Sequence, residues 1–227
     1  MRTEPYLGAL ADLFYPQRCV GCQSRASDVL CRSCFEALPW IEAPFCERCG
    51  VPTAVDVFVC EECKGVDFGF ESARAPLRHE GVGKRIVHAL KYGGYLRVVE
   101  RLAAPIMREF VAGDFDVVVP VPLHRSRLRR RGFNQAEVLA RGLAERIKVP
   151  ASDKLQAVRR TRDQVELSAA GRRANVAGAF RARGTVRGRA LLVDDVFTTG
   201  ATLSACAGAL RRAGAGEEHV LSLCRTC

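Results

Sequence analysis

Apolar residues in the second part of the chain follow two spacings, short continuous runs and helical repeats. The short runs predict strands at residues 72–79, 116–122, 154–158, 190–193 and 219–223. Helical spacing, as in Ile86, Val87 and Leu90, predicts helices, which fall at residues 82–92, 96–111, 134–147 and 201–213. Strands that alternate with helices predict an α/β fold with a parallel sheet and right-handed crossovers.

Two segments follow neither pattern. Residues 159–175 are polar and rich in Arg, which predicts a mobile loop with a short helix. Residues 19–63 are rich in turn-forming residues, and most of the cysteines of the chain fall among them. We therefore expect a small cysteine-rich domain at residues 1–66 and an α/β domain at residues 67–227.

The overall charge is strongly positive. The formal net charge is +10, and most of the 35 basic residues are Arg. Guanidinium groups suit an anionic partner, although a general preference for Arg would give the same composition. The apolar segment at residues 7–14 is short and contains Asp12, unlike a signal peptide, and no run is long enough to span a membrane. We expect a cytoplasmic protein whose cysteines bind metal.

Eight cysteines form four Cys-x-x-Cys pairs between residues 19 and 63. Two such pairs supply the four thiolates of a tetrahedral zinc site, which has a structural role. The predicted ligands of up to two zinc ions are Cys19, Cys22, Cys31, Cys34, Cys46, Cys49, Cys60 and Cys63. Free or redox-active cysteines are the alternatives, and sequential and cross-braced pairing both remain open. We find no partners for a metal site at Cys224 and Cys227, and we expect Cys206 to be a core residue.

A phosphate-sugar site is predicted at residues 190–202, where an apolar strand runs into two acids, a Thr/Gly-rich turn and a helix. The free N–H groups of such a turn, with the helix N-terminus, bind anions. Asp194 and Asp195 can accept hydrogen bonds from sugar hydroxyls. The alternative is a capped strand end with solvated acids.

The run VDDVFTTGAT at residues 193–202 resembles the 5-phosphoribosyl-1-pyrophosphate (PRPP) motif of type I phosphoribosyltransferases. The resemblance implies a parallel sheet with a small hood and a mobile loop, and it implies that Asp194 and Asp195 hold the ribose hydroxyls. The residues that it places around the 5-phosphate are Thr198, Thr199, Gly200, Ala201 and Thr202.

The resemblance narrows to the ComF/ComFC competence proteins, which share the PVP strand and GFNQ segment within residues 118–140. The HALKY run at residues 88–92, the segment at residues 164–180 and the cysteine pairs also fit. It implies that pyrophosphate approaches the loop after the PVP strand, where Lys91 can assist, and we expect magnesium to accompany PRPP. The residues of that loop are Val121, Pro122, Leu123, His124 and Arg125.

A basic cluster follows the PVP strand. Its predicted nucleic-acid contacts are Arg127, Arg129, Arg130, Arg131 and Phe133, the last by stacking on an unpaired base. Pyrophosphate binding and a merely solvated loop are the alternatives. A second cluster is formed by Arg159, Arg160, Arg162, Arg172 and Arg173 in the predicted mobile loop.

Three functions fit these residues. The resemblance implies a PRPP-binding, zinc-containing protein that assists single-stranded DNA uptake in natural transformation, with a competence helicase or translocase as partner. An active magnesium-dependent phosphoribosyltransferase of unknown acceptor is the second, and a PRPP-sensing regulator is the third. The sequence shows neither a nucleobase pocket nor a clear general base, for which His124 is the best-placed candidate.

Overall fold

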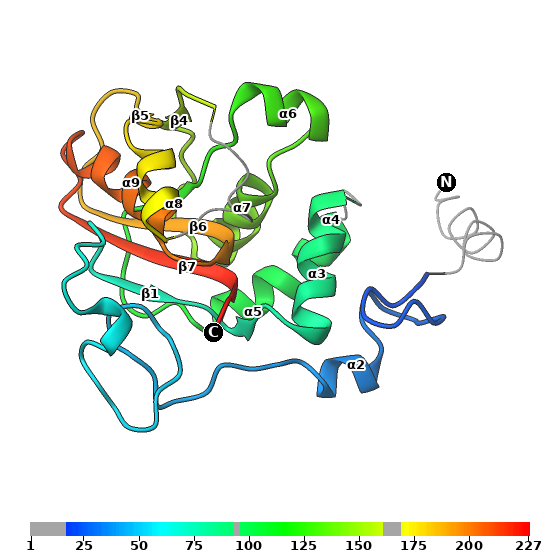
Figure 1. Cartoon of the computed structure of the whole chain (residues 1–227). Helices are drawn as coiled ribbons and strands as arrows, with labels where there is room; N and C mark the ends of the chain where they lie inside the picture. The colour runs from blue at the N-terminus through cyan, green and yellow to red at the C-terminus, as the bar shows by residue number, and fades with distance from the viewer. Residues whose placement is uncertain (1–16, 93–95, 161–168) are drawn as a thin grey trace.

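The computed structural model of the protein describes residues 17–92, 96–160 and 169–227. A parallel sheet lies at its centre and the cysteine-rich segment runs beside it (Figure 1). The strands follow the order β1-β7-β6-β3, with β2 paired to β7, and every one of these pairs is parallel. The strands of this sheet are β1 (Ser72–Arg74), β2 (Leu77–Arg78), β3 (Val117–Pro120), β6 (Arg189–Phe197) and β7 (Glu217–Arg225). The predicted α/β fold with a parallel sheet is confirmed.

Helices cover both faces of the sheet. Successive residues of a strand point to opposite faces, so Leu191 and Val193 of β6 enter one core and Leu192 enters the other. The first core includes residues of α3, α5 and α7, and the second includes residues of α9. The described helices of this part are α3 (Gly81–Tyr92), α4 (Leu96–Val98), the π-helical turn η2 (Val99–Ala103), α5 (Ala104–Arg108), α6 (Arg125–Arg131), α7 (Gln135–Ile147), α8 (Ala169–Val176) and α9 (Ala201–Arg211).

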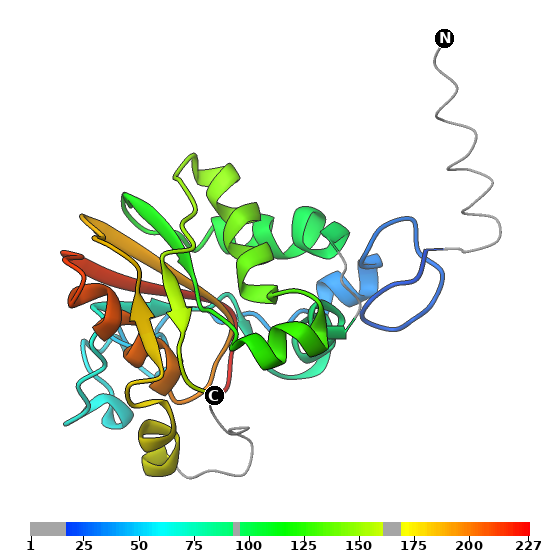
Figure 2. The ribbon, with the colours of Figure 1, turned by 90° about the horizontal axis from the view of Figure 1, so that it is seen from above.

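The strand predicted at residues 154–158 lies outside the parallel sheet. It forms β4 (Leu155–Ala157), which pairs antiparallel with β5 (Phe180–Ala182) in a separate two-stranded sheet (Figure 2). The prediction that it joins the parallel sheet is wrong, because the partner is a strand that the pattern did not reveal. The predicted strand at residues 72–79 is also divided, since Pro76, which has no N–H, separates β1 from β2.

Two helices differ from prediction. The helix predicted over residues 96–111 changes to π geometry at η2 and ends at Arg108, and Pro105 near the start of α5 removes one N–H from the ladder. Residues 125–131, for which a solvated loop was one of the alternatives, form the helix α6. His124 caps its first turn by accepting from the amide of Ser126, and Gly132 ends it in the left-handed conformation.

The cysteine-rich segment contributes to both cores. Cys19 and Cys34 pack in the core that holds α3, whereas Cys46, Cys49 and Cys63 pack in the core that holds α9. Regular structure is sparse in this segment and comprises α2 (Arg32–Glu36) and the short 3₁₀ helix η1 (Glu61–Cys63). The segment therefore packs against the α/β part rather than forming a separate core.

We predict that Gly83→Ala destabilises the protein. A Cβ at Gly83 would lie 2.5 Å from the backbone oxygen of Arg78, so α3 would have to move away from β2. Overpacking of this kind costs about 1–3 kcal/mol. The matched control is Gly208→Ala in α9, where a Cβ meets only the flexible end of Arg212 at 3.4 Å and the better helix former should stabilise slightly. Denaturant unfolding measures both, and equal stability of the two variants would contradict the prediction.

Candidate functional site

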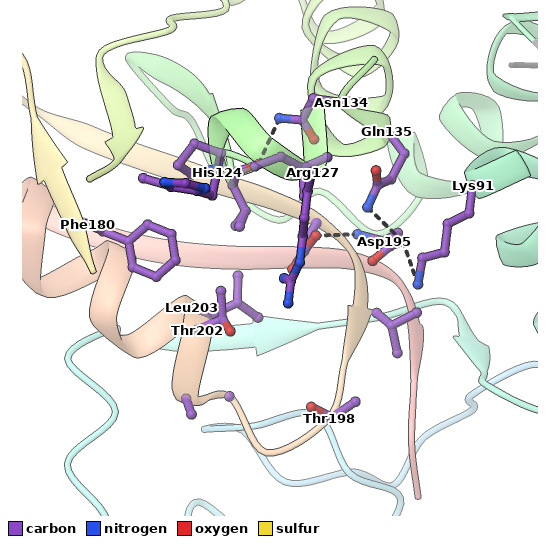
Figure 3. A pocket seen from close by; sticks show the side chains of 18 of the residues that line it. Lys91, His124, Arg127, Asn134, Gln135, Phe180, Asp195, Thr198, Thr202 and Leu203 are labelled. Carbon is purple, nitrogen blue, oxygen red and sulfur yellow. Dashed lines mark hydrogen bonds and ion pairs between the residues drawn. The ribbon is translucent and has the colours of Figure 1, made fainter. Parts of the chain in front are cut away.

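A cavity of about 240 Å³ opens where β3 and β6 end (Figure 3). Ligands of parallel α/β sheets commonly bind at the carboxyl ends of the strands. The lining residues include Lys91, Val121, Pro122, Leu123, His124, Arg127, Asn134, Gln135, Asp194, Asp195, Thr198, Gly200, Ala201 and Thr202. The two acids, most of the Thr/Gly turn and most of the predicted pyrophosphate loop therefore share one cavity.

Asp195 is a buried carboxylate held by two other elements. It is only 5 % exposed, and its Oδ2 lies 3.0 Å from Nζ of Lys91 at the end of α3. Gln135 at the start of α7 donates to the same oxygen at 3.2 Å. Figure 3 shows both side chains pointing at Asp195. Asp195 is therefore not a solvated acid, because its side chain is buried and is held by Lys91 and Gln135.

Asp194 has a different electrostatic environment. Burial and the neighbouring charge of Asp195 raise its pKa well above the usual value for a carboxyl group. The backbone N–H of Asp195 donates to its Oδ1 at 2.9 Å and partly offsets that rise. A ligand hydroxyl that donates to Asp194 would stabilise its ionised form in the same way.

The turn between β6 and α9 leads directly into the N-terminus of α9, where the first backbone N–H groups have no partner within the helix. Gly200 adopts a φ of 72° and a Cβ there would lie 2.9 Å from the rings of Phe197 and Phe68, so the position requires glycine. Thr198, Gly200, Ala201 and Thr202 line the cavity, whereas Thr199 lines a neighbouring one. The Oγ1 of Thr199 is buried and has no hydrogen-bond partner among the described residues.

The loop after β3 brings four of its five predicted residues to the cavity, and Arg125 is not among the lining residues. Asn134 fixes this loop, because its Nδ2 donates to the carbonyl of Val121 at 3.0 Å. The Nδ1 of His124 lies 2.8 Å from Oγ of Ser126. Asn134 and Gln135 had no predicted role in the cavity, although an Asn directly before a helix is a capping signal that a sequence shows.

A second cavity of about 340 Å³ adjoins the first one, and Lys91 and Arg127 line both. Its other lining residues are Tyr92, Arg130, Arg131 and Phe133. Tyr92 is 72 % exposed, and the guanidinium of Arg131 lies 5.9 Å from its ring centre. The predicted nucleic-acid residues therefore gather here, except Arg129, and Tyr92 is a participant that the sequence did not single out. In the second Arg cluster, Arg159 lines the first cavity, while Arg162 and the side chains of Arg172 and Arg173 lie outside the described residues.

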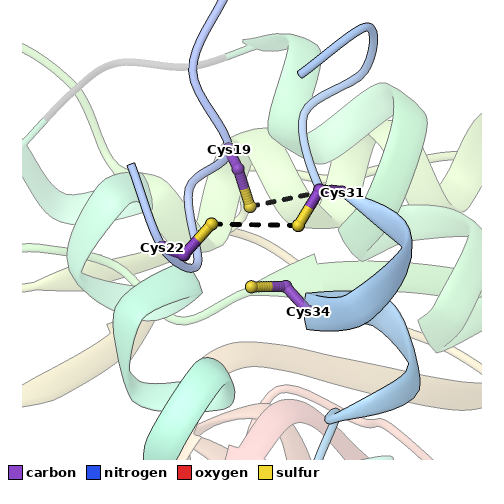
Figure 4. Close-up of side chains that lie close together, drawn as sticks. All are labelled: Cys19, Cys22, Cys31 and Cys34. Atoms are coloured by element: carbon purple, nitrogen blue, oxygen red, sulfur yellow. Dashed lines mark hydrogen bonds between the residues drawn. The ribbon is translucent and has the colours of Figure 1, made fainter. Parts of the chain in front are cut away.

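The eight N-terminal cysteines form two groups of four. Cys19, Cys22, Cys31 and Cys34 form one group, and their sulfurs converge on a common centre (Figure 4). The second group is Cys46, Cys49, Cys60 and Cys63, and in each group the sulfur atoms lie within 4.8 Å of one another. The ligands therefore pair sequentially rather than in a cross-braced order.

Both groups fit zinc. A tetrahedron with Zn–S bonds of about 2.3 Å places its sulfurs about 3.8 Å apart. The sulfur atoms of Cys22 and Cys31 lie 3.8 Å apart, as do those of Cys49 and Cys60. The backbone amides of Gly21 and Cys31 each donate to the sulfur of Cys19 at 3.3 Å. A Cβ at Gly21 would lie 2.7 Å from the sulfur of Cys34, so only glycine leaves room beside the ligand. Among the described residues no third such group occurs, and both Cys206 and Cys224 are buried in the core.

Comparisons with known proteins agree with this architecture. Residues 10–64 match the model of the double zinc ribbon domain. DNA utilization protein YhgH of Salmonella typhimurium is 32% identical over 206 residues, which cover 87% of this chain and 90% of that protein. Competence protein F of Haemophilus influenzae is 27% identical and covers 93% and 98% of the two chains. The chain belongs to the ComF/ComFC family. Competence protein ComFC of Bacillus subtilis is 25% identical, with coverage of 84% and 81%.

Among solved structures, a match is found to the glutamine PRPP amidotransferase of B. subtilis in complex with ADP and GMP. The match covers 59% of this ComF-family chain and 30% of the amidotransferase chain, with 25% sequence identity and a TM-score of 0.41. The architecture is an α/β fold with a parallel sheet, preceded by a cysteine-rich zinc ribbon, as predicted. Among the described residues, no helix has the length and apolar character needed to cross a membrane.

We predict that this ComF-family protein binds two zinc ions and that each four-cysteine group holds one. Cys22→Ser and Cys60→Ser should each lower the zinc content by one ion per chain, because a three-thiolate remnant holds zinc less tightly. Cys227→Ser is the matched control and should leave the content unchanged. Elemental analysis of the purified proteins measures this, and a folded wild-type protein without zinc would contradict the assignment.

Proposed function

We propose that the protein binds PRPP or a related phosphoribosyl ligand in the β6–α9 cavity and assists single-stranded DNA uptake in the cytoplasm during transformation. The observation that carries the proposal is the meeting of two carboxylates, a Thr/Gly turn and several cations in one cavity. Carboxylates accept hydrogen bonds from sugar hydroxyls, and helix-opening amides bind phosphate. A phosphorylated ribose is a ligand that satisfies both groups at once.

Each part of PRPP has a matching surface in the cavity. The 5-phosphate suits the turn formed by Thr198, Gly200 and Thr202, and the ribose hydroxyls suit Asp194 and Asp195. Lys91 and Arg127 supply positive charge for the pyrophosphate. Magnesium, which prefers oxygen ligands, would bind through the phosphates, and the carboxylates of the cavity offer further oxygens of that kind.

Lys91 has two competing partners in this proposal. In the ligand-free protein its ammonium group pairs with Asp195 at 3.0 Å. A ribose hydroxyl that donates to Asp195 would replace part of that interaction, and the ammonium group would then be available to the pyrophosphate. The ion pair therefore holds Lys91 beside the position proposed for the ribose hydroxyls.

The DNA part of the proposal rests on the second cavity and on the competence proteins among the relatives. Arg130 and Arg131 would contact phosphates, while Tyr92 and Phe133 offer aromatic rings on which an unpaired base can stack. Arg129 is exposed on the same helix and would add to the electrostatic attraction. A competence helicase or translocase would be the protein partner.

We predict that PRPP binding strengthens as pH rises through the pKa of Asp194. The pKa of this carboxyl is raised in the free protein, and hydroxyl donors of the ligand favour its ionised form, so binding releases a proton. For the same reason the ligand-free protein should lose stability over that pH range, since ionising a buried acid is unfavourable. Asp194→Asn should weaken PRPP binding about tenfold, which corresponds to about 1.4 kcal/mol. The same substitution should remove the dependence of PRPP affinity on pH.

Isothermal titration calorimetry in buffers of different ionisation enthalpy measures both the affinity and the proton release. Asp153→Asn, which changes an exposed acid outside the cavity, is the matched control. Unchanged PRPP affinity in the Asp194 variant would refute the proposed ribose contact. Release of pyrophosphate on addition of a nucleobase would instead establish the transferase alternative.

We predict that the double substitution Arg129→Ala and Arg130→Ala weakens single-stranded DNA binding and lowers its salt dependence. Each lost phosphate contact reduces the slope of log affinity against log salt by about 0.7. The double variant Arg141→Ala and Arg146→Ala removes the same charge from α7 and is the control. Fluorescence anisotropy across a salt series measures both. Equal losses in the two variants would show a general charge effect and exclude α6 as the DNA-binding surface.

A further inference from the structure

Arg225, the last residue of β7, is a buried cation outside the cavity. It is 3 % exposed and pairs in the sheet with Phe197, the last residue of β6. A buried charge costs several kcal/mol unless other groups compensate it, so the contacts of this guanidinium decide how the surrounding segments pack.

The guanidinium of Arg225 contacts the second four-cysteine group. Its Nη1 donates to the carbonyl of Cys49 at 2.7 Å, and Nη2 lies 3.6 Å from Glu62, which stands between the ligands Cys60 and Cys63. Its Nε has no hydrogen-bond partner among the described residues. Arg225 therefore fixes the backbone of one predicted zinc ligand and lies beside the pair that completes the site.

The same guanidinium lies against the base of the phosphate turn. Its central carbon is 4.5 Å from the ring centre of Phe197, a cation–π distance. The carbonyl of Phe197 accepts from the amide of Thr226 at 2.9 Å, which ties the two strand ends together. The Phe197 ring in turn supports the turn, because a Cβ at Gly200 would lie only 2.9 Å from it.

A second set of aromatic contacts links the segment after the cysteines to Gly200. Phe68 follows the last cysteine of the second group, and its ring also lies 2.9 Å from the position of a Gly200 Cβ. Phe68 stacks on Phe70 with ring centres 5.0 Å apart, and Phe70 contacts Phe197 edge to face at 6.2 Å. The turn thus rests on rings whose positions depend on the second cysteine group.

We infer that Arg225 is a positioning residue that couples zinc occupancy of the second cysteine group to ligand binding by the β6–α9 turn. The inference rests on the proposed phosphoribosyl function. When zinc holds Cys49 in place, Arg225 and Phe197 hold the turn in its anion-binding conformation. Coupling of this kind is reciprocal in binding free energy, so a ligand on the turn also tightens zinc binding by the second group. We expect the tighter binding to appear as slower zinc release.

The experiment uses full-length zinc-loaded protein and two measurements, PRPP affinity by calorimetry and zinc release to a coloured chelator. In the wild type, saturating PRPP should slow the release of the second-group zinc about fivefold or more, which is the lower end of measured couplings. The slowed fraction is identified with Cys22→Ser protein, which carries only the second site. Arg225→Met, which keeps the length but removes the charge and the hydrogen bonds, should weaken PRPP binding and abolish the slowing.

Arg74→Met is the matched control. The guanidinium of Arg74 also contacts the segment that holds the second cysteine group. It donates to the carbonyl of Glu47 at 2.7 Å, pairs with the Glu47 carboxylate and lies 4.8 Å from the ring centre of Phe45. Among the described contacts of Arg74, none is with Phe197. Its substitution should hasten zinc release while leaving PRPP affinity unchanged. Arg225→Lys should restore part of the coupling, because it retains the charge but not the planar group.

Each outcome decides between the inference and the proposed function. If wild-type protein does not bind PRPP, the proposed function fails and the coupling with it. If wild-type protein binds PRPP but Arg225→Met binds equally well, or PRPP still slows zinc release in that variant, only the coupling is overturned. Should Arg225→Met fail to fold, Phe197→Leu tests the same contact, because it removes the ring and leaves the hydrogen bond to Cys49 in place.

Discussion

Two adjacent carboxylates at the end of a buried parallel strand are the constraint on which the rest of the site depends. Successive residues of β6 point to opposite faces, so Asp194 and Asp195 require compensation from different elements. Lys91 and Gln135 supply it for Asp195, and a backbone amide supplies part of it for Asp194. The raised pKa of Asp194 shows that its compensation is incomplete until a donor arrives.

The stability of the cysteine-rich segment depends on its cysteines. Several of its large apolar side chains are exposed, Phe58 and Val55 among them, whereas its sulfurs enter the two cores that flank the sheet. Thiolates bound to zinc would replace the apolar packing that such a short segment lacks. Because the first group packs with α3, which carries Lys91, and the second lies behind the β6–α9 turn, each ribbon supports a different side of the cavity.

Local patterns predicted the parts of the molecule that local forces determine. The apolar run of β6, the Thr/Gly turn and the spacing of the cysteines are short motifs, and each forms the expected structure. The grouping of the cysteines could not be predicted, because both pairings satisfy the same spacing. The site roles proposed for Asp194, Asp195 and the α6 arginines remain predictions.

The failures concern interactions between distant segments. No helix was predicted at residues 125–131, where caps at His124 and Gly132 stabilise α6. The antiparallel partner of β4 comes from β5, a three-residue strand whose pattern is too short to recognise. Likewise, no local signal links Lys91 or Gln135 to Asp195, because the sheet brings α3 and α7 to the end of β6 only in the folded chain.

The two proposed binding surfaces are not electrically independent. Lys91 and Arg127 line both cavities, and the charge of an anion in one cavity reduces the positive potential available in the other. If PRPP occupies the first cavity, a DNA phosphate that approaches Tyr92 and Phe133 would meet a weaker positive potential. This effect needs no movement of the backbone, since it follows from shared side chains at short range. Under the proposed function, the phosphoribosyl ligand and DNA would therefore be linked through electrostatics, whereas the inferred link to zinc would run through packing.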